Sequence, residues 1–380
     1  MEENRPPLDT AASVTPPVRK RRRWKKIVAG VVLGLAFFSG IAWRVMFYMP
    51  GQSFSGDLPP LAAAEEGQGQ GLSLARELER DVRKLAIDIG PRNVRRREKL
   101  AAAAQFVERE LTQAGYRVGR QTYKVEGVDC VNLEAEIKGT KTPTEIVLVG
   151  AHYDSYDTTP GADDNASGTA SMLALARRFA TSHPARTVRF VAFTNEEQPY
   201  FQRGTMGSLV YARSCHKRNN NLVCVLCLET MGYYSDQENS QRYPRPLDLI
   251  YPSKGNFIGV VGNVASRPLV HTVVASLRKH ADFPTEGAAM PNGVPGVGWS
   301  DHWSFWQEGY QAVMITDTAL FRNPHYHKTT DTPDKLNFDH LARVVLGLEG
   351  VVRDMAGGQE PNDTKKSSGK KEEATQEVTP

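Results

Sequence analysis

Several largely apolar runs of the chain end next to an acidic or imidazole side chain, and this pattern limits the folds that the sequence can adopt. Three such runs are residues 144–151 (TEIVLVGA), 187–194 (TVRFVAFT) and 222–228 (LVCVLCL). Because they are nearly continuous rather than alternating, they are typical of strands covered on both faces. His152 follows the first run and Glu229 follows the third. Such strands belong to mostly parallel sheets, which bind ligands beyond the carboxyl ends of their strands.

Segments with helical periodicity alternate with these runs along the chain. The expected helices cover residues 74–86, 98–114, 166–180, 207–214, 267–279 and 338–352, and the further expected strands cover residues 131–137, 247–251 and 311–318. This alternation predicts an α/β fold of three layers (α/β/α), in which helices lie on both faces of a mostly parallel, mixed central sheet.

A basic segment and an apolar segment precede the predicted domain. Residues 19–26 (RKRRRWKK) hold seven basic residues, and residues 27–43 hold no charge. The uncharged segment spans roughly 25 Å as a helix, and residues 45–49 extend it toward the ~30 Å of a bilayer core. Because the basic residues precede the span, we expect a cytosolic N-terminus and a periplasmic or extracellular domain. The alternative is a cleaved signal peptide with a weak cleavage site at residues 40–42.

Composition divides the chain into five segments. We expect a cytosolic segment over residues 1–26, a transmembrane signal anchor over 27–49, a linker over 50–73, a folded domain over 74–356 and a disordered tail over 357–380. The net charge of +4 comes from the basic segment, and nothing in the remainder indicates nucleic-acid binding. The four cysteines have no zinc-knuckle spacing and are expected to be buried thiols.

Two short motifs after the first run carry groups that suit metal ions. His152 and Asp154 form an H-x-D pair, in which the imidazole suits a metal and the carboxylate suits orienting its ring. Asp163 and Asp164 are neighbours in the segment PGADDNASG, where two carboxylates repel each other unless a cation lies between them. One of them can bridge two metals. Taken alone, the motifs also fit a solvated strand end and an acidic helix cap.

Three later positions complete the set. Glu196 and Glu197 follow the second run, and such a pair can divide its work between binding a metal and holding a proton. Glu229 closes an apolar strand, where a carboxylate is costly unless it is paired or bound to a metal. His327 lies in a turn-rich loop, with His325 as a competitor for the role of ligand. Together these groups are the inventory of a two-metal hydrolase.

These motifs resemble those of the M28 metallopeptidases, the co-catalytic di-zinc aminopeptidases and their relatives. The resemblance covers about residues 75–355 and rests on His152-x-Asp154, residues 161–168 (GADDNASG), residues 195–197 (NEE), Glu229, residues 299–305 (WSDHWSF) and residues 327–332 (HKTTDT). It implies a zinc-exopeptidase-like fold and two Zn²⁺ ions, with Co²⁺ or Mn²⁺ able to substitute.

The resemblance also implies roles for individual residues. The implied metal ligands are His152, Asp163, Glu197, Glu229 and His327. Among them, Asp163 corresponds to the carboxylate that bridges both metals, and a cis peptide bond would join it to Asp164. Glu196 corresponds to the general base, and Asp154 corresponds to the residue that orients His152.

The sequence departs from the family pattern at two places. Glu229 stands where many relatives have Asp, which keeps an oxygen ligand on a longer side chain. Residues 198–206 are longer than the turn that is common in the family, and Tyr200 and Phe201 are expected to wall a substrate pocket. The substrate preference of the family therefore does not transfer to this chain.

The residues and the resemblance together predict a membrane-anchored zinc exopeptidase, an aminopeptidase that removes N-terminal residues from peptides. Its expected partners are peptide substrates and, through the N-terminal helix, the lipid bilayer. Two alternatives stay open at this point. One is a glutaminyl cyclase-like acyltransferase with a single zinc, and the other is a non-catalytic ectodomain on the same fold.

Overall fold

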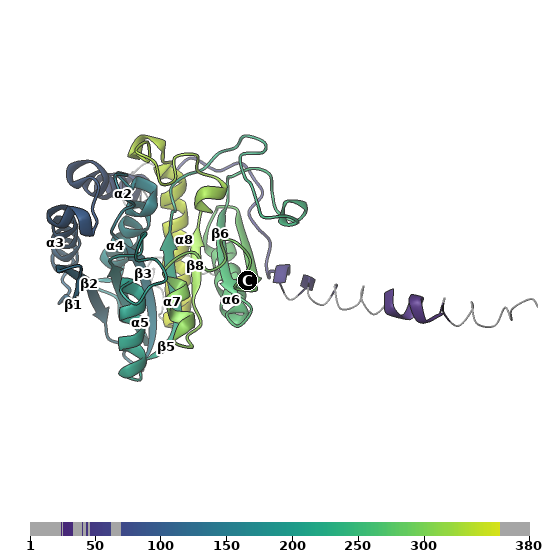
Figure 1. Ribbon diagram of the computed structural model, residues 1–380, viewed down its shortest axis with the longest axis horizontal. Helices are drawn as coiled ribbons and strands as arrows, with labels where there is room; N and C mark the ends of the chain where they lie inside the picture. Colours follow the sequence, from purple (N-terminus) through teal and green to yellow (C-terminus); the bar gives the residue numbers. More distant parts are fainter. Residues whose placement is uncertain are drawn as a thin grey trace, which may run out of the picture. The chain divides into compact units, whose positions relative to one another are not determined.

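The computed structural model describes residues 24, 26–32, 40, 43–44, 46–61 and 70–357 of the chain. Contacts divide the chain into two units, Met1–Tyr48 and Met49–Pro380. The sheet and the helices described below belong to the second unit (Figure 1).

The first unit contains the predicted anchor except for Met49. Its described helical residues are 24, 26–32, 40, 43–44 and 46–47. Within the described part of the chain, no helix combines the length and the apolar character that crossing a bilayer requires. Most of the predicted cytosolic segment, residues 62–69 of the predicted linker and the predicted tail beyond Gly357 lie outside the described residues.

The second unit is built on a mixed sheet of eight strands in the order β1-β2-β4-β3-β5-β8-β6-β7. The strands are β1 (Gly119–Val125), β2 (Val128–Ile137), β3 (Thr142–His152), β4 (Arg186–Phe193), β5 (Asn221–Glu229), β6 (Ile258–Asn263), β7 (Thr285–Met290) and β8 (Val313–Thr316). Neighbouring strands are parallel from β4 through β3 and β5 to β8, and again from β6 to β7. The pairs β1–β2, β2–β4 and β6–β8 are antiparallel. The predicted α/β fold with a mixed sheet is confirmed, and its parallel strands lie at the centre.

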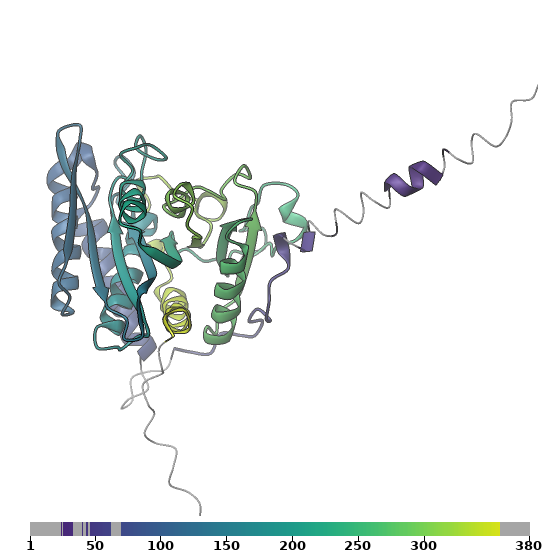
Figure 2. The same ribbon diagram turned by 90° about the horizontal axis from the view of Figure 1, so that it is seen from below.

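Helices pack on both faces of this sheet. They are α2 (Gln70–Arg83), α3 (Arg97–Gln113), α4 (Gly168–Phe179), α5 (Gly207–Lys217), α6 (Arg267–His280), α7 (His302–Gln307) and α8 (Phe338–Ala356). Helices α3, α4, α6 and α8 contact one face, and α2 packs outside them against α4 and α8. Figure 2 shows α8 (yellow) and α6 (green) on the same side of the sheet. Helices α5 and α7 contact the other face.

The alternation of side chains along the strands explains the two layers of core. On β5, Leu226 and Leu228 join the larger apolar cluster, which contains the helices of the first face. Val225 and Cys227 join the smaller cluster, which contains residues of α5 and α7. Because successive residues of a strand point to opposite faces, one continuously apolar run supplies both clusters.

The structure differs from the sequence-based expectation at four strands. The strand expected over residues 247–251 is wrong, because this segment holds a short 3₁₀ helix, Leu247–Leu249, flanked by prolines, and Leu249 is exposed. The sequence analysis missed β1, β6 and β7. Strand β1 is half exposed, and β6 (IGVVGN) and β7 (TEGAAM) contain glycine and alanine in place of large apolar residues.

Residues 49–53, the last residue of the predicted anchor and the start of the predicted linker, make hydrogen bonds within the second unit. The guanidinium of Arg278 donates to the carbonyl oxygens of Met49, Pro50 and Gly51 at 3.4, 3.0 and 2.9 Å. The hydroxyl of Ser53 accepts a hydrogen bond from the backbone N–H of Thr285 at 2.8 Å. Residues 49–53 therefore lie along the edge of the sheet at α6 and β7.

Candidate metal centre

The predicted site residues meet at the carboxyl edge of the central parallel strands. His152 is the last residue of β3, and Glu229 is the last residue of β5. Glu196 and Glu197 lie in the loop after β4, and Asp164 lies in the irregular turn Ala162–Ser167 that leads into α4. All five side chains are buried. Parallel strands present their carboxyl ends at one edge, which brings these five residues together.

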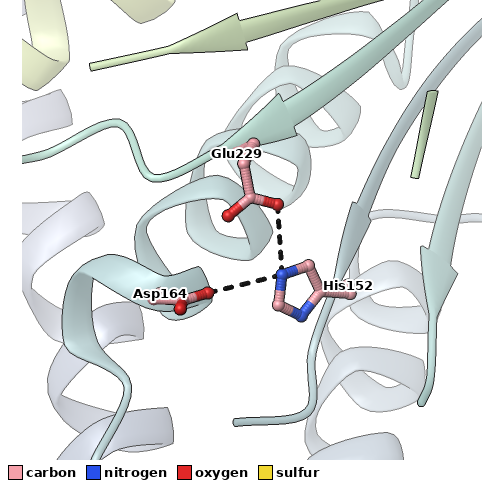
Figure 3. Close-up of side chains that lie close together, drawn as sticks. All are labelled: His152, Asp164 and Glu229. Carbon is pink, nitrogen blue, oxygen red and sulfur yellow. Dashed lines mark ion pairs between the residues drawn. The ribbon is translucent and has the colours of Figure 1, made fainter. Parts of the chain in front are cut away.

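A first group of ligand atoms comes from His152, Asp164 and Glu229 (Figure 3). Nε2 of His152 lies 3.2 Å from Oε2 of Glu229 and 3.5 Å from Oδ1 of Asp164. One ligand atom from each residue lies within 4.8 Å of the others. An imidazole and two carboxylates are the donor set that suits a divalent cation such as zinc.

A second group is formed by Asp164, Glu197 and His327. Nε2 of His327 lies 3.0 Å from Oδ2 of Asp164 and 3.2 Å from Oε2 of Glu197. Asp164 thus takes part in both groups, with Oδ1 facing His152 and Oδ2 facing His327. A carboxylate placed in this way is suited to bridging two cations.

The sequence analysis chose the wrong aspartate for this position. The carboxylate of Asp163 faces away from both groups, because its Oδ1 accepts a hydrogen bond from the N–H of Gly232 at 2.9 Å and its Oδ2 accepts one from Nδ2 of Asn323 at 2.7 Å. The predicted position of the cis bond is also wrong by one residue, since the cis peptide joins Asp164 to Asn165. The shared carboxylate is therefore that of Asp164.

Asp154 connects the first histidine to the glutamate pair. Its Oδ1 lies 3.5 Å from Nδ1 of His152, the ring nitrogen that faces away from the ligand group. Its two oxygens also accept hydrogen bonds from the backbone N–H groups of Glu196 and Glu197, both at 3.2 Å. The side chain of Glu196 belongs to neither ligand group, and its Oε2 lies 3.9 Å from Nε2 of His152.

Several acidic side chains are buried close together in the site, and their burial and mutual charges shift the pKa values of the site residues. Burial, with the nearby charge of Asp164, raises the pKa of Glu197 to about 8. Burial also raises the pKa of Glu196 well above its usual value. Burial alone would lower the pKa of His327, but Asp164 and Glu197 outweigh it and raise this pKa to about 10. The cluster therefore favours an added positive charge.

Several buried atoms of the site form ion pairs but no hydrogen bonds with the described part of the protein. Both ring nitrogens of His152, Oδ2 of Asp164, Oε1 of Glu197 and Nε2 of His327 are buried and have no hydrogen-bond partner among the described residues. Buried polar groups are normally hydrogen-bonded or bound to a metal. The arrangement of these atoms fits divalent cations at the two groups.

Three further residues support the site, and the sequence analysis gave them no role. The hydroxyl of Ser300 donates to Oε2 of Glu229 at 2.6 Å. The carboxylate of Asp331 accepts from the backbone N–H groups of Asp163 and Asp164 at 2.9 and 3.2 Å. Ser300 and Asp331 stand inside motifs that the family resemblance already marked, so the motifs were the available signal.

Arg92 is the third supporting residue, and no motif marks it. Its side chain is fully buried and donates to four carbonyl oxygens, those of Leu85, Tyr153, Pro160 and Gly161. It therefore ties the loop that carries Asp154 to the loop that carries Asp164.

Two other expectations concern residues at the margin of the site. His325, the competitor of His327, belongs to neither ligand group, and its Nδ1 lies 2.9 Å from Oγ1 of Thr330. The longer loop, residues 198–206, reaches residue 298 through a hydrogen bond from Gln202 to the carbonyl of Gly298. Tyr200 and Phe201 do not line the cavity beside Glu229, which other aromatic residues enclose.

Solved structures of known proteins share this fold. A zinc aminopeptidase from Bacillus subtilis aligns with a TM-score of 0.60 and 15% identity, covering 74% of this chain and 95% of that chain. A glutaminyl cyclase from Fimbriiglobus ruber aligns with a TM-score of 0.55 and 21% identity, covering 80% of this chain and 99% of that chain. At these identities the likeness shows the fold alone.

Sequence comparisons identify the family. The model of peptidase family M28 matches residues 132–350. The uncharacterized protein YfbL of Escherichia coli is 34% identical over 333 residues, which cover 85% of this chain and 97% of that protein. The probable aminopeptidase YDR415C of Saccharomyces cerevisiae is 25% identical over 56% of this chain and 54% of that protein. The chain therefore belongs to peptidase family M28.

Proposed function

We propose that this M28 peptidase is a zinc-dependent aminopeptidase, which removes N-terminal residues from peptides. The observation that carries the proposal is the pair of ligand groups that meet at Asp164, one with His152 and Glu229 and the other with Glu197 and His327. Two groups of complementary donors around one shared carboxylate support a site for two divalent cations.

The proposed metal ligands are His152, Asp164, Glu197, Glu229 and His327. When bound, zinc ions lower the pKa of water and polarise a carbonyl group, which is the chemistry that amide hydrolysis needs. Asp154 would hold the ring of His152 in its tautomer and orientation, as carboxylates beside metal-binding histidines do. Ser300 would fix the orientation of the Glu229 carboxylate through its hydrogen bond.

Glu196 is proposed as the general base. Its carboxylate lies at the edge of the first ligand group without belonging to it, and Asp154 fixes its backbone. From this position it would accept a proton from the attacking water and then donate it to the leaving amine. The neighbouring Glu197 is committed to the second ligand group.

A glutaminyl cyclase-like reaction is the second candidate, because glutaminyl cyclases occur among proteins with this fold. Such a cyclase is expected to need a single zinc. The second group is complete here, since His327 and Glu197 both face Asp164. This completeness favours hydrolysis with two cations over cyclisation.

One experiment separates the two functions. The purified protein is loaded with zinc, its metal content is counted, and it is assayed with an amino-acyl chromogenic amide and with a glutaminyl peptide. We expect two metals per chain and release of the chromogenic amine, which a chelator abolishes and zinc restores. One metal per chain together with pyroglutamyl product would establish the cyclase instead.

We also propose that residues 27–49 anchor the protein in a membrane with its peptidase domain in the periplasm or cell exterior. The support is the basic segment at residues 19–26 followed by the uncharged segment at residues 27–43. A reporter enzyme fused after Met355 should be active only outside the cytosol. Cytosolic reporter activity would contradict this topology, and a mature N-terminus near Trp43 would indicate a cleaved signal instead.

A further inference from the structure

A large cavity opens beside the candidate metal centre. Its empty space is about 860 Å³, including the part that is open to solvent, and Glu229 and Tyr326 are among the residues that line it. Glu229 is a proposed metal ligand, and the ring of Tyr326 stacks on that of His327 with centroids 3.9 Å apart. The cavity and the metal centre therefore share a wall, so that a substrate bound at one can extend into the other.

The floor of the cavity is a part of the sheet that helices do not cover. Helix α6 covers β6 and β7 on one face, and a Cβ atom added at Gly262 or Gly287 would meet its side chains. Gly259 and Glu286 lie at positions of the opposite parity and therefore face the cavity. Loops close the space above them, with aromatic walls supplied by Tyr243, Tyr251, Trp299 and Phe321.

Glu286 lies in the same row of the sheet as Glu229. In the registered strand pairs, Glu229 lies opposite Thr316, Thr316 opposite Gly259, and Gly259 opposite Glu286. Three strand spacings separate the two glutamates, which corresponds to about 14 Å between their Cα atoms. Of the two residues between them in this row, Gly259 has no side chain and Thr316 has a short one.

The carboxylate of Glu286 lies among largely apolar walls, and within the described part of the chain its contact is an ion pair rather than a hydrogen bond. Its side chain is 24% exposed, and Nη2 of Arg278 is its ion-pair partner at 3.8 Å from Oε2. The hydrogen bonds of Arg278 go instead to carbonyl oxygens, those of Thr285 and of residues 49–51. Burial raises the pKa of Glu286, and the charge of Arg278 offsets this rise only in part, so a further positive charge beside the carboxylate would stabilise its ionised form.

One other charged residue besides the two glutamates lines the cavity. It is Arg242, whose Nη2 donates to the carbonyl oxygen of Leu320 at 3.3 Å. The ion pair of Glu286 is made with Arg278, which lies outside the cavity lining. Glu286, at the end of the cavity away from Glu229, is therefore the group that is suited to bind a cation.

We propose that this cavity receives the side chain of the substrate's N-terminal residue, and that Glu286 selects a long side chain with a terminal cation, of the lysine or arginine type. This inference rests on the aminopeptidase function proposed above. The apolar walls suit the methylene stem of such a side chain, and the carboxylate suits its charged end. An extended basic side chain that starts at the metal centre covers part of the distance of about 14 Å, and the Glu286 side chain covers the rest.

Two substrates that differ mainly in this charge test the inference. Lysyl p-nitroanilide and norleucyl p-nitroanilide have similar stems, and the second lacks the ammonium group. With the zinc-loaded protein we expect kcat/KM for the lysyl amide to exceed that for the norleucyl amide by about 10- to 100-fold, as for a charge-assisted hydrogen bond in a partly buried site. In Glu286→Gln this ratio should fall to about one.

A surface variant and a binding measurement complete the design. Glu238→Gln removes a glutamate outside the cavity lining, whose side chain is 67% exposed, and it should keep the wild-type ratio. Calorimetric binding of L-lysinamide and L-norleucinamide should show the same preference and the same loss in Glu286→Gln, without requiring turnover.

The outcomes distinguish this inference from the proposed function. Equal kcat/KM values for the two amides in the wild-type protein would overturn the role of Glu286 and leave the aminopeptidase intact. A preference that survives in Glu286→Gln would assign the selection to another group and would also overturn it. Pyroglutamyl formation without amide hydrolysis would overturn the proposed function itself. The role of Glu286 would still be testable by calorimetry in that case, and equal binding of the two amino-acid amides would reject it.

Discussion

The imidazole ring of His327 lies parallel to the ring of Tyr156, with centroids 4.1 Å apart and an interplanar angle of 2°. Tyr326 stacks on His327 as well, at 3.9 Å and 15°. His152 is oriented differently, since the carboxylate of Asp154 lies 3.5 Å from its Nδ1. The two histidines of the site are thus held by different physical means, one by a neighbouring charge and the other by stacked rings.

Replacing Tyr156 by alanine should weaken the second metal site and spare the first. The stack orients the His327 ring, and residues that orient a metal ligand typically contribute about 10- to 100-fold in metal affinity. We expect the affinity for one of two zinc ions to fall by about tenfold, as measured by titration against a competing chelator. Tyr156→Phe keeps the aromatic face and should restore both affinities. Two wild-type affinities in Tyr156→Ala would show that the stack does not orient His327.

The choice between Asp163 and Asp164 can be tested by metal content. Asp164→Asn removes the charge shared by both groups and should reduce the binding of both metals. Asp163→Asn should retain both metals, and it should lower the free energy of unfolding by about 1–3 kcal/mol, because a buried acceptor of three hydrogen bonds is altered. Metal analysis and chemical denaturation of the two variants give the comparison. Loss of metal in Asp163→Asn alone would restore the original assignment.

The two adjacent glutamates should give different results when each is changed to glutamine. Glu196→Gln keeps size and polarity but cannot accept a proton, so kcat should fall by about 10²–10⁴-fold with the metal content unchanged. Glu197→Gln removes a charged member of the second ligand group, so metal affinity should fall together with activity. If the metal is lost in the first variant and kept in the second, the two roles must be exchanged. Full activity of Glu196→Gln would reject the proposed general base.

The two histidines of the last loop provide a matched pair. His327→Ala should lose metal from the second group, because Nε2 of His327 faces Asp164 and Glu197. His325→Ala should keep the metal content of the wild type, because the ring of His325 bonds to Thr330 outside the group. The measurement is zinc content after exhaustive dialysis. The reverse pattern would identify His325 as the ligand.

The sequence separated the strand-end residues more clearly than it separated the two neighbouring aspartates. His152 and Glu229 could be placed because each closes an apolar run, and the end of a strand fixes where such a residue lies. Asp163 and Asp164 are identical neighbours in a loop, so spacing cannot separate them. Their difference comes from the backbone of the turn, which leaves the helical conformation at Asp164 (φ −107°, ψ 92°) and at Asn165 (φ −132°, ψ 46°).

The sequence patterns did not predict the substrate cavity, and the reason is related. Its floor is formed by β6 and β7, whose glycine and alanine residues give little periodic signal. The role proposed for Glu286 depends on the register of three strand pairs, which brings residues from distant parts of the chain into one row. The sequence analysis missed Arg92 because its side chain bonds to backbone carbonyl groups. Every residue has such a group, so these bonds produce no recognisable side-chain motif.

Strand β7 forms one edge of the sheet, and residues 49–53 lie against it. This contact affects how readily the protein aggregates in solution. The N–H of Thr285 is bonded to Ser53, the carbonyl oxygen of Thr285 to Arg278, and the carbonyl oxygen of Gly287 to the hydroxyl of Tyr251. An edge strand whose backbone groups are occupied in this way is a poor template for strands of other molecules. Removing the segment ahead of residue 62 would free the N–H of Thr285 and expose part of this edge, which favours aggregation, so a fragment for structural work should begin at or before Met49.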